Sequence, residues 1–251
     1  MKTISKIILF FVLFSIGFFL LRICGPLFGY NVSTLVADLG GLTYLYSAVG
    51  IIFAIFTAFA IMSQIERWNG LTSAVKKEAG ALKELYFWSQ HISDFNLKKR
   101  FSIHIKQYLS VVIERAFAKS SVGEKYYEIN IIIDSLHDDL YDTKNVAPQL
   151  MPIGFDAFSD LLKAHDERLH YASTNLPKIL KNTLDFNDAL LVVLSLMLGV
   201  HNGWLDYFFV ASIAILCFVI HLVVKDLDSP MESGNWHLTA KDYQEVFDYI
   251  K

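Results

Sequence analysis

Four apolar stretches without a charged residue stand out in the sequence, and the longest of them constrains the fold most. It runs for 27 residues, from Leu39 to Ile65. A helix rises about 1.5 Å per residue and the hydrocarbon core of a bilayer is about 30 Å thick, so roughly 20 residues cross it. This stretch therefore predicts a transmembrane helix with length to spare.

The other three uncharged stretches are shorter and cover residues 7–21, 189–205 and 207–224. The first reaches across a bilayer if Arg22 snorkels outward and the helix continues toward Pro26. The second of the three must begin upstream, near Ile179 or Leu184, and then carries Asp188 into or against the headgroup region. With these extensions the sequence predicts four transmembrane helices.

A secretory signal peptide is the main alternative for the first stretch, because Lys2 and Lys6 precede a short apolar run. No A-x-A-like cleavage site follows it, and the segment 22–25 is a poor substitute. We therefore expect the first helix to be retained.

The charged residues are concentrated in the middle of the chain. Of the 47 Asp, Glu, Lys and Arg residues, 32 lie between Glu66 and Asp185, which indicates a water-exposed domain between apolar flanks. This middle segment holds 16 Lys and Arg, whereas segments 24–38 and 201–206 hold none. Because Lys and Arg accumulate in cytoplasmic segments, we expect the middle and both ends of the chain in the cytoplasm, and the protein in a bacterial inner (plasma) membrane.

The composition excludes several classes of protein. At 54% hydrophobic residues the chain is too apolar for a soluble enzyme, and a net charge of -3 leaves no basic excess for a nucleic acid. Cys24 and Cys217 stand alone in apolar runs and predict neither a disulfide nor a zinc site. None of the common catalytic or nucleotide-binding motifs is present in the sequence, so we expect no enzyme and no cofactor.

Two groups of polar residues resemble metal-ligand sets but have simpler interpretations. His165 and His170 are five residues apart, which places them on different faces of a helix, so we expect a solvated charged face there. The run His137-Asp138-Asp139 is interpreted as a helix end. The sequence therefore predicts no metal site.

The charged middle segment is predicted to be helical. Apolar residues recur at intervals of three and four in four stretches, at residues 68–88, 97–117, 129–140 and 155–176. Ile131-Ile132-Ile133 alone is compatible with a strand, but its flanks keep the helical spacing. Turns are expected at Ser93-Asp94, at 120–123 and at 148–154, and a capping box at Thr239 is expected to start a last helix. Four helices with one apolar face each predict a bundle.

The order of short motifs along the chain resembles a known family. The motifs, in order, are Glu66-Arg67-Trp68, Val75-Lys76-Lys77-Glu78-Ala79 with Leu82 and Leu85, Lys99-Arg100, Tyr108 with 111–114, Arg168-Leu169, Leu176-Pro177, and Asp226-Leu227-Asp228-Ser229-Pro230 with Gly234. They resemble the bestrophin-like membrane family, a domain of unknown function related to bestrophin anion channels. The resemblance covers roughly residues 7–250 and implies a homopentamer whose second helices line a central pore.

The resemblance also implies a narrow apolar neck in the pore. Ile51, Ile55 and Phe59 lie at i, i+4 and i+8 of the predicted second helix, and Ile52 with Phe56 forms a neighbouring pair. Five copies of such side chains around an axis would make a constriction that excludes water and gates the flow of ions. Without the resemblance, apolar residues every four in a membrane helix indicate contact with lipid or with neighbouring helices.

Three residues near the cytoplasmic end of the last span are candidate regulatory groups. His221 lies close in sequence to Asp226, and these two residues are a candidate proton-sensing pair. Asp226 and Asp228 stand where calcium-activated bestrophins carry an acidic clasp. Two carboxylates are too few for Ca²⁺, which takes six or more oxygen ligands, so we expect no calcium switch.

Together these observations predict an all-α integral membrane protein with four transmembrane helices and a cytoplasmic helical bundle between helices two and three. The expected parts are transmembrane helices 1 and 2 (1–65), the cytoplasmic domain (66–178), transmembrane helices 3 and 4 (179–225) and a cytoplasmic C-terminal segment (226–251). The expected function is passive permeation of chloride-like anions through a homo-oligomer in the lipid bilayer. The alternative is a membrane-anchored interaction or sensing module whose cytoplasmic domain binds a partner or ligand.

Overall fold

The computed structural model describes residues 2–27, 39–116, 122–198, 202–230 and 236–250, and their regular elements are all helical. The elements are α1 (Lys2–Leu27), α2 (Leu39–Ser89), α3 (Phe95–Val111) with a π-helical turn (Val112–Ala116), α4 (Val122–Val146), a 3-10 turn (Pro148–Leu150), α5 (Met151–Ser173), α6 (Lys178–Met197), α7 (Gly203–Asp228) and α8 (Lys241–Tyr249). Residues 120 and 121 of one expected turn, and Gly234 of the last motif, lie outside the described residues.

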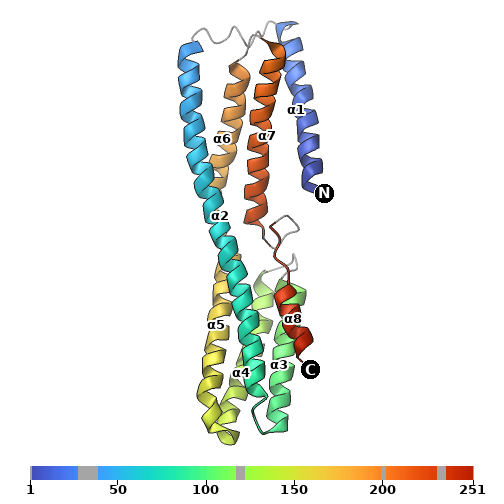
Figure 1. Cartoon of the computed structure of the whole chain (residues 1–251), viewed down its shortest axis with the longest axis vertical. Coiled ribbons are helices and arrows are strands. Elements are labelled where there is room, and N and C mark those ends of the chain that lie inside the picture. The colour runs from blue at the N-terminus through green and yellow to red at the C-terminus, as the bar shows by residue number, and fades with distance from the viewer. Residues whose placement is uncertain (1, 28–38, 117–121, 199–201, 231–235, 251) are drawn as a thin grey trace. The chain divides into compact units, whose positions relative to one another are not determined.

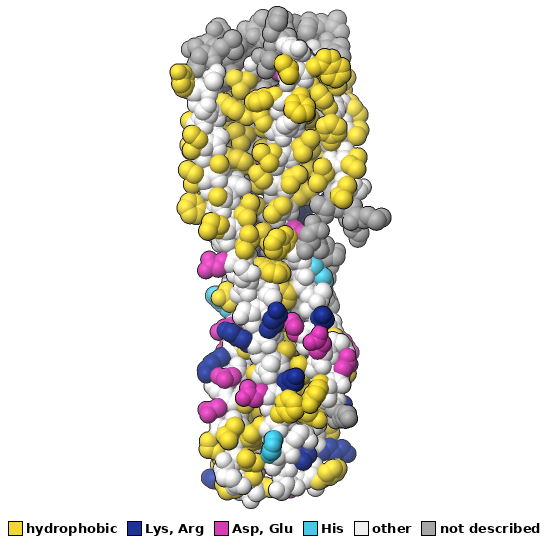
Figure 2. Space-filling model, viewed as in Figure 1, with side chains coloured by type: hydrophobic (Ala, Val, Ile, Leu, Met, Phe, Trp, Pro, Cys, Tyr) yellow, Lys and Arg dark blue, Asp and Glu magenta, His cyan; other side chains and the backbone are white. Residues whose placement is uncertain are grey.

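The chain forms two compact units. The first comprises residues 1–65 and 176–228, and the second comprises 66–175 and 229–251. In the first unit, α7 packs against both α1 and α6, and the first half of α2 completes the group (Figure 1). On the face shown in Figure 2, its described side chains are mostly hydrophobic, whereas charged side chains are spread over the second unit. The first unit therefore has the surface expected of a part surrounded by lipid.

Three helices in the described residues are long and apolar enough to cross a membrane: Ile4–Arg22 of α1, Thr43–Ser89 of α2 and Gly203–Asp228 of α7. Helix α6 does not meet this description, although it begins where the third span was predicted to begin. Its first eleven residues include Lys178, Lys181, Asp185 and Asp188. These charges lower its mean hydropathy, so length and composition alone do not establish a fourth span.

Arg22 does not extend outward as its position in the sequence suggested. Its guanidinium lies 2.8 Å from the Asp206 carboxylate and donates a 3.1 Å hydrogen bond to the Leu196 carbonyl. Asp206 is 5% exposed, so the ion pair is screened by little water. Arg22 thereby connects α1 to the beginning of α7 and the end of α6.

The second unit is built around one hydrophobic core, to which α2, α3, α4, α5 and α8 contribute. The four predicted helical stretches correspond to the second half of α2 and to α3, α4 and α5, and the isoleucine run is helical. Helix α5 ends at Ser173, before Leu176, and Phe117 lies outside the described residues. Asp94 caps α3 by accepting hydrogen bonds from the backbone amides of Asn96 and Leu97 at 2.7 and 3.1 Å. These predictions are confirmed. The apolar faces of these helices pack against one another in the same core.

The two predicted helix starts near proline and threonine differ from the structure. Helix α5 already begins at Met151, with Pro152 in its first turn, where a missing backbone N–H costs nothing. Helix α8 begins after Ala240, without a side-chain cap, so the capping box predicted at Thr239 is wrong. Packing of Tyr243 and Val246 into the core fixes α8 instead.

Candidate functional site

Helix α2 has two opposite faces in the first unit. Phe53, Thr57 and Ala60 are 7%, 6% and 0% exposed and form the packed face. Ile55 and Phe59 are 52% and 70% exposed. At 100° per residue, Ile55 and Phe59 lie on the side of the helix away from that packed face.

All five predicted neck residues belong to the exposed side of α2. Ile51 is 62% exposed, Ile52 is 52% exposed and Phe56 is 41% exposed, and they join Ile55 and Phe59 in one continuous apolar surface. Five large apolar side chains exposed side by side on a single chain indicate contact with lipid or with another protein surface. The role of the five residues in a neck stays a prediction.

The structure gives His221 a different partner from the one its sequence position suggested. Its Nδ1 lies 2.9 Å from Oδ1 of Asp185, on α6, and both side chains are partly exposed. Helices α6 and α7 pack together, which brings residues 36 positions apart to the same level. Asp188 joins this pair, since one ligand atom from each of Asp185, Asp188 and His221 lies within 4.8 Å of the others. Spacing along the sequence does not reveal this group, because the two aspartates lie on α6 and the histidine lies on α7.

Asp228 holds the end of α7 to the beginning of α6. Its Oδ1 accepts a 2.8 Å hydrogen bond from the Leu176 backbone amide, and its Oδ2 forms an ion pair with Lys181. Asp226 is partly buried in the last turn of α7. The Asp226–Pro230 motif therefore ends a helix, as its proline predicts, and also fixes the start of the neighbouring one.

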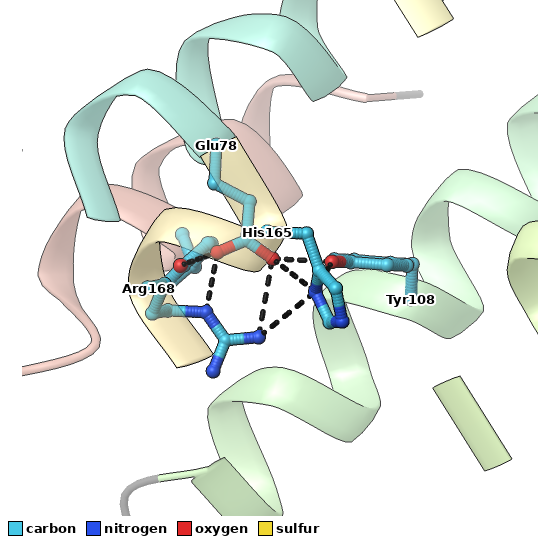
Figure 3. A network of polar contacts seen from close by, with 5 residues as sticks. Glu78, Tyr108, His165 and Arg168 are labelled. Atoms are coloured by element: carbon cyan, nitrogen blue, oxygen red, sulfur yellow. Dashed lines mark hydrogen bonds and ion pairs between the residues drawn. The ribbon is translucent and has the colours of Figure 1, made fainter. Parts of the chain in front are cut away.

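A buried polar network lies at the centre of the second unit (Figure 3). Glu78, on α2, is 0% exposed and accepts hydrogen bonds through both carboxylate oxygens. Arg168 on α5 forms an ion pair with it, Tyr108 on α3 donates to Oε1, and Tyr243 on α8 donates to Oε2 at 2.6 Å. His165 places its Nδ1 3.1 Å from Oε1. The network joins four helices through one carboxylate.

The charge of Glu78 is stabilised in spite of its burial. Burial raises the pKa of its carboxyl, but the Arg168 charge and the hydrogen bonds from His165, Arg168 and Tyr108 outweigh it and lower the pKa to about 2. Burial, together with the nearby Glu78 charge, raises the pKa of Tyr108 and of Tyr243. Glu78 is therefore ionised and both tyrosines are protonated at neutral pH, as their hydrogen bonds require. A carboxylate with both oxygens engaged and no exposure is suited to holding helices together rather than to catalysis.

Two interpretations of polar runs made from the sequence are wrong. His165 was expected on a solvated face, but it is 3% exposed and belongs to the Glu78 network. The run at His137 was expected to end a helix, but it lies in the interior of α4. There Asp139 is buried, accepts a hydrogen bond from His104 at 2.8 Å and forms an ion pair with Arg100 at 3.2 Å. Spacing along one helix could not reveal these partners, because they belong to other helices.

The fold and its helices define a class: an all-helical protein with a long second helix shared by an apolar unit and a charged unit. The chain belongs to the bestrophin-like family, whose family model, described as the bestrophin-like domain, matches residues 12–232. No curated protein matches the sequence.

Solved structures show the same fold at low sequence identity. The crystal structure of a bacterial bestrophin homolog from Klebsiella pneumoniae matches with a TM-score of 0.77 at 13% identity, covering 98% of this chain and 97% of that one. A single-residue variant of that homolog gives 0.76 at 13% identity and covers 100% and 98%. The crystal structure of a membrane protein with a single-residue substitution matches with a TM-score of 0.75 at 14% identity, and covers 98% of this chain and 97% of that one. The similarity spans the whole length of both chains and establishes the bestrophin fold.

Proposed function

We propose that this chain is the subunit of a homopentameric channel that passes anions passively across the bacterial inner membrane. Membership of the bestrophin-like family supports this function, as does the fold it shares with a bacterial bestrophin homolog. The observation that carries the proposal is the exposed apolar face of α2. Ile51, Ile55 and Phe59 recur on it at one-turn intervals and have no partner in the core of the described chain.

In this proposal the first unit lies in the membrane with four crossings, and the second unit and both ends lie in the cytoplasm. Helix α6 supplies the crossing that composition alone does not support. One of its charges is compensated within the unit, because Lys181 pairs with Asp228, and Asp185 has a polar partner in His221. Compensated charges near the end of a span cost less in a bilayer than isolated ones.

The neck would act through its size and its lack of polar groups. A ring of five Phe59 side chains, followed one turn away by Ile55 and two turns away by Ile51, leaves permeating ions few groups that replace their water. The ring edges of phenylalanine carry partial positive charge and favour anions over cations at such a point. The cytoplasmic segment has 16 acidic and 16 basic residues between Glu66 and Asp185, so selectivity must come from the pore.

Two measurements on the purified protein test this proposal. The mass of the complex in detergent should equal five chains of 28.6 kDa, and liposomes containing the protein should release chloride when a gradient is applied. A monomer or dimer contradicts the channel, because too few α2 helices are present to surround a pore. A pentamer that releases no anion contradicts permeation and favours the interaction or sensing module.

A further inference from the structure

The packed helices of the first unit form layers, and a polar layer lies between two apolar ones. Two hydrophobic clusters each draw on α2, α6 and α7. One includes Phe53, Leu191 and Cys217, and the other includes Ala60, Leu184 and Val224. Each cluster thus marks one level along the three helices.

Three polar residues lie between these two levels: Thr57, Asp188 and His221. On each helix, the polar residue lies four positions after one cluster residue and three positions before the other. Helical spacing therefore places all three at one level. Thr57 is 6% exposed, and its Oγ1 has no hydrogen-bond partner among the described residues. The same holds for Oδ1 of Asp188, which is shielded from solvent. These two oxygens are thus without a partner among the described residues, and an unpaired buried oxygen costs free energy.

A metal ion would supply a partner for the Asp188 carboxylate. Asp185 and Asp188 are three residues apart on α6, and His221 faces them from α7, with one ligand atom from each within 4.8 Å of the others. Two carboxylates also balance the charge of a divalent cation. Asp185 and His221 are partly exposed, so the described chain does not enclose the ligand atoms.

We propose that Asp185, Asp188 and His221 form a binding site for a divalent transition-metal ion such as Zn²⁺. Imidazole and carboxylate together suit Zn²⁺, whose bonds to nitrogen and oxygen are about 2.0–2.2 Å, better than Ca²⁺, which takes oxygen ligands. Three protein ligands leave one tetrahedral position for water, as in exchangeable zinc sites. The ion connects α6 to α7 beside the packed face of α2. This inference is independent of anion permeation.

Binding of Co²⁺ to the full-length protein in detergent, after treatment with a chelator, tests the site. The wild-type protein should show visible Co²⁺ absorption bands that saturate at one ion per chain and disappear when Zn²⁺ is added. His221→Gln and Asp185→Asn should each weaken binding by on the order of 100-fold. His104→Gln is the control and should bind Co²⁺ like the wild type. It removes a similar histidine–aspartate pair, His104 with Asp139, that belongs to the second unit and not to the proposed site.

The thermal unfolding midpoint provides a second readout. Zn²⁺ should raise it in the wild type and in His104→Gln, but not in Asp188→Asn, where a neutral amide replaces the ligand. Asp185 is exposed, so Asp185→Asn should fold normally and keeps the test decisive if Asp188→Asn does not fold. Absence of saturable Co²⁺ binding in the wild type would overturn the proposal, as would equal binding by His221→Gln and Asp185→Asn.

Discussion

Phe59→Ala should increase chloride flux through the reconstituted protein about tenfold, which corresponds to lowering the barrier by about 1.4 kcal/mol. Phe59 is the most exposed of the five predicted neck residues, at 70%. Truncation therefore removes little packing within the subunit. In a pentamer it would remove five rings from the narrowest part of the pore and let water enter it. Chloride release from liposomes at equal protein content measures the change.

Two other phenylalanines provide controls for this variant. Phe208 on α7 is 72% exposed, so Phe208→Ala removes the same group from another surface and should leave the flux unchanged. Phe53 is 7% exposed in the packed face of α2, so Phe53→Ala should lower thermal stability without raising the flux. Equal flux in the wild type, Phe59→Ala and Phe208→Ala would show that Phe59 does not restrict a pore.

Glu78→Gln should lower the free energy of unfolding by about 3–5 kcal/mol, because it leaves the Arg168 guanidinium buried without its counter-charge. The two partners are 0% and 4% exposed in their side chains. Denaturant unfolding followed by tryptophan fluorescence measures the loss.

Lys77→Gln is the matched control: Lys77 precedes Glu78 and forms an exposed ion pair with Glu167 at 2.8 Å. It should unfold like the wild type, because exposed pairs contribute little. Similar stability of both variants would contradict a central role for Glu78.

The pKa of Glu78 also predicts how acid affects the second unit. Its folded pKa of about 2 lies below the ordinary 4.5, so ionised Glu78 contributes stability that is fully present above pH 4.5. That contribution should decline as the pH falls from 4.5 toward 2. Glu78→Gln should lack this part of the acid-induced loss, since its side chain does not titrate.

Local sequence patterns were sufficient for the helices because each one reports on a single element. The 27 uncharged residues before Glu66 predicted the apolar half of α2, and the three-and-four spacing of apolar residues predicted the rest of it. The same reasoning gave α3, α4 and α5, whose apolar faces meet in one core. Spacing also placed Ile55 and Phe59 on one helical face, which the structure leaves exposed, and their role in a neck stays a prediction.

These local patterns do not predict which residues of different helices contact one another. Glu78 occupies a position of the apolar face of α2, which signals burial, but its partners Arg168 and Tyr243 lie 90 and 165 residues away. The grouping of Asp185, Asp188 and His221 depends on the register between α6 and α7, which no single helix determines. Arg22 likewise forms an ion pair with Asp206, which is far from it in the sequence and lies on another helix. Charges in apolar surroundings are thus visible in the sequence, whereas their partners are not.

Accessibility of single cysteines along α2 tests most directly whether its exposed face surrounds an aqueous pore. Cys24 and Cys217 are first replaced by alanine, and single cysteines are then placed at Ile51, Ile55 and Thr57 in the protein reconstituted in liposomes. A charged, membrane-impermeant thiol reagent should modify Ile51→Cys and Ile55→Cys, and it should leave Thr57→Cys, on the packed face, unmodified. If it modifies neither outward position while a lipid-soluble maleimide labels both, the exposed face of α2 contacts lipid and the pore is contradicted.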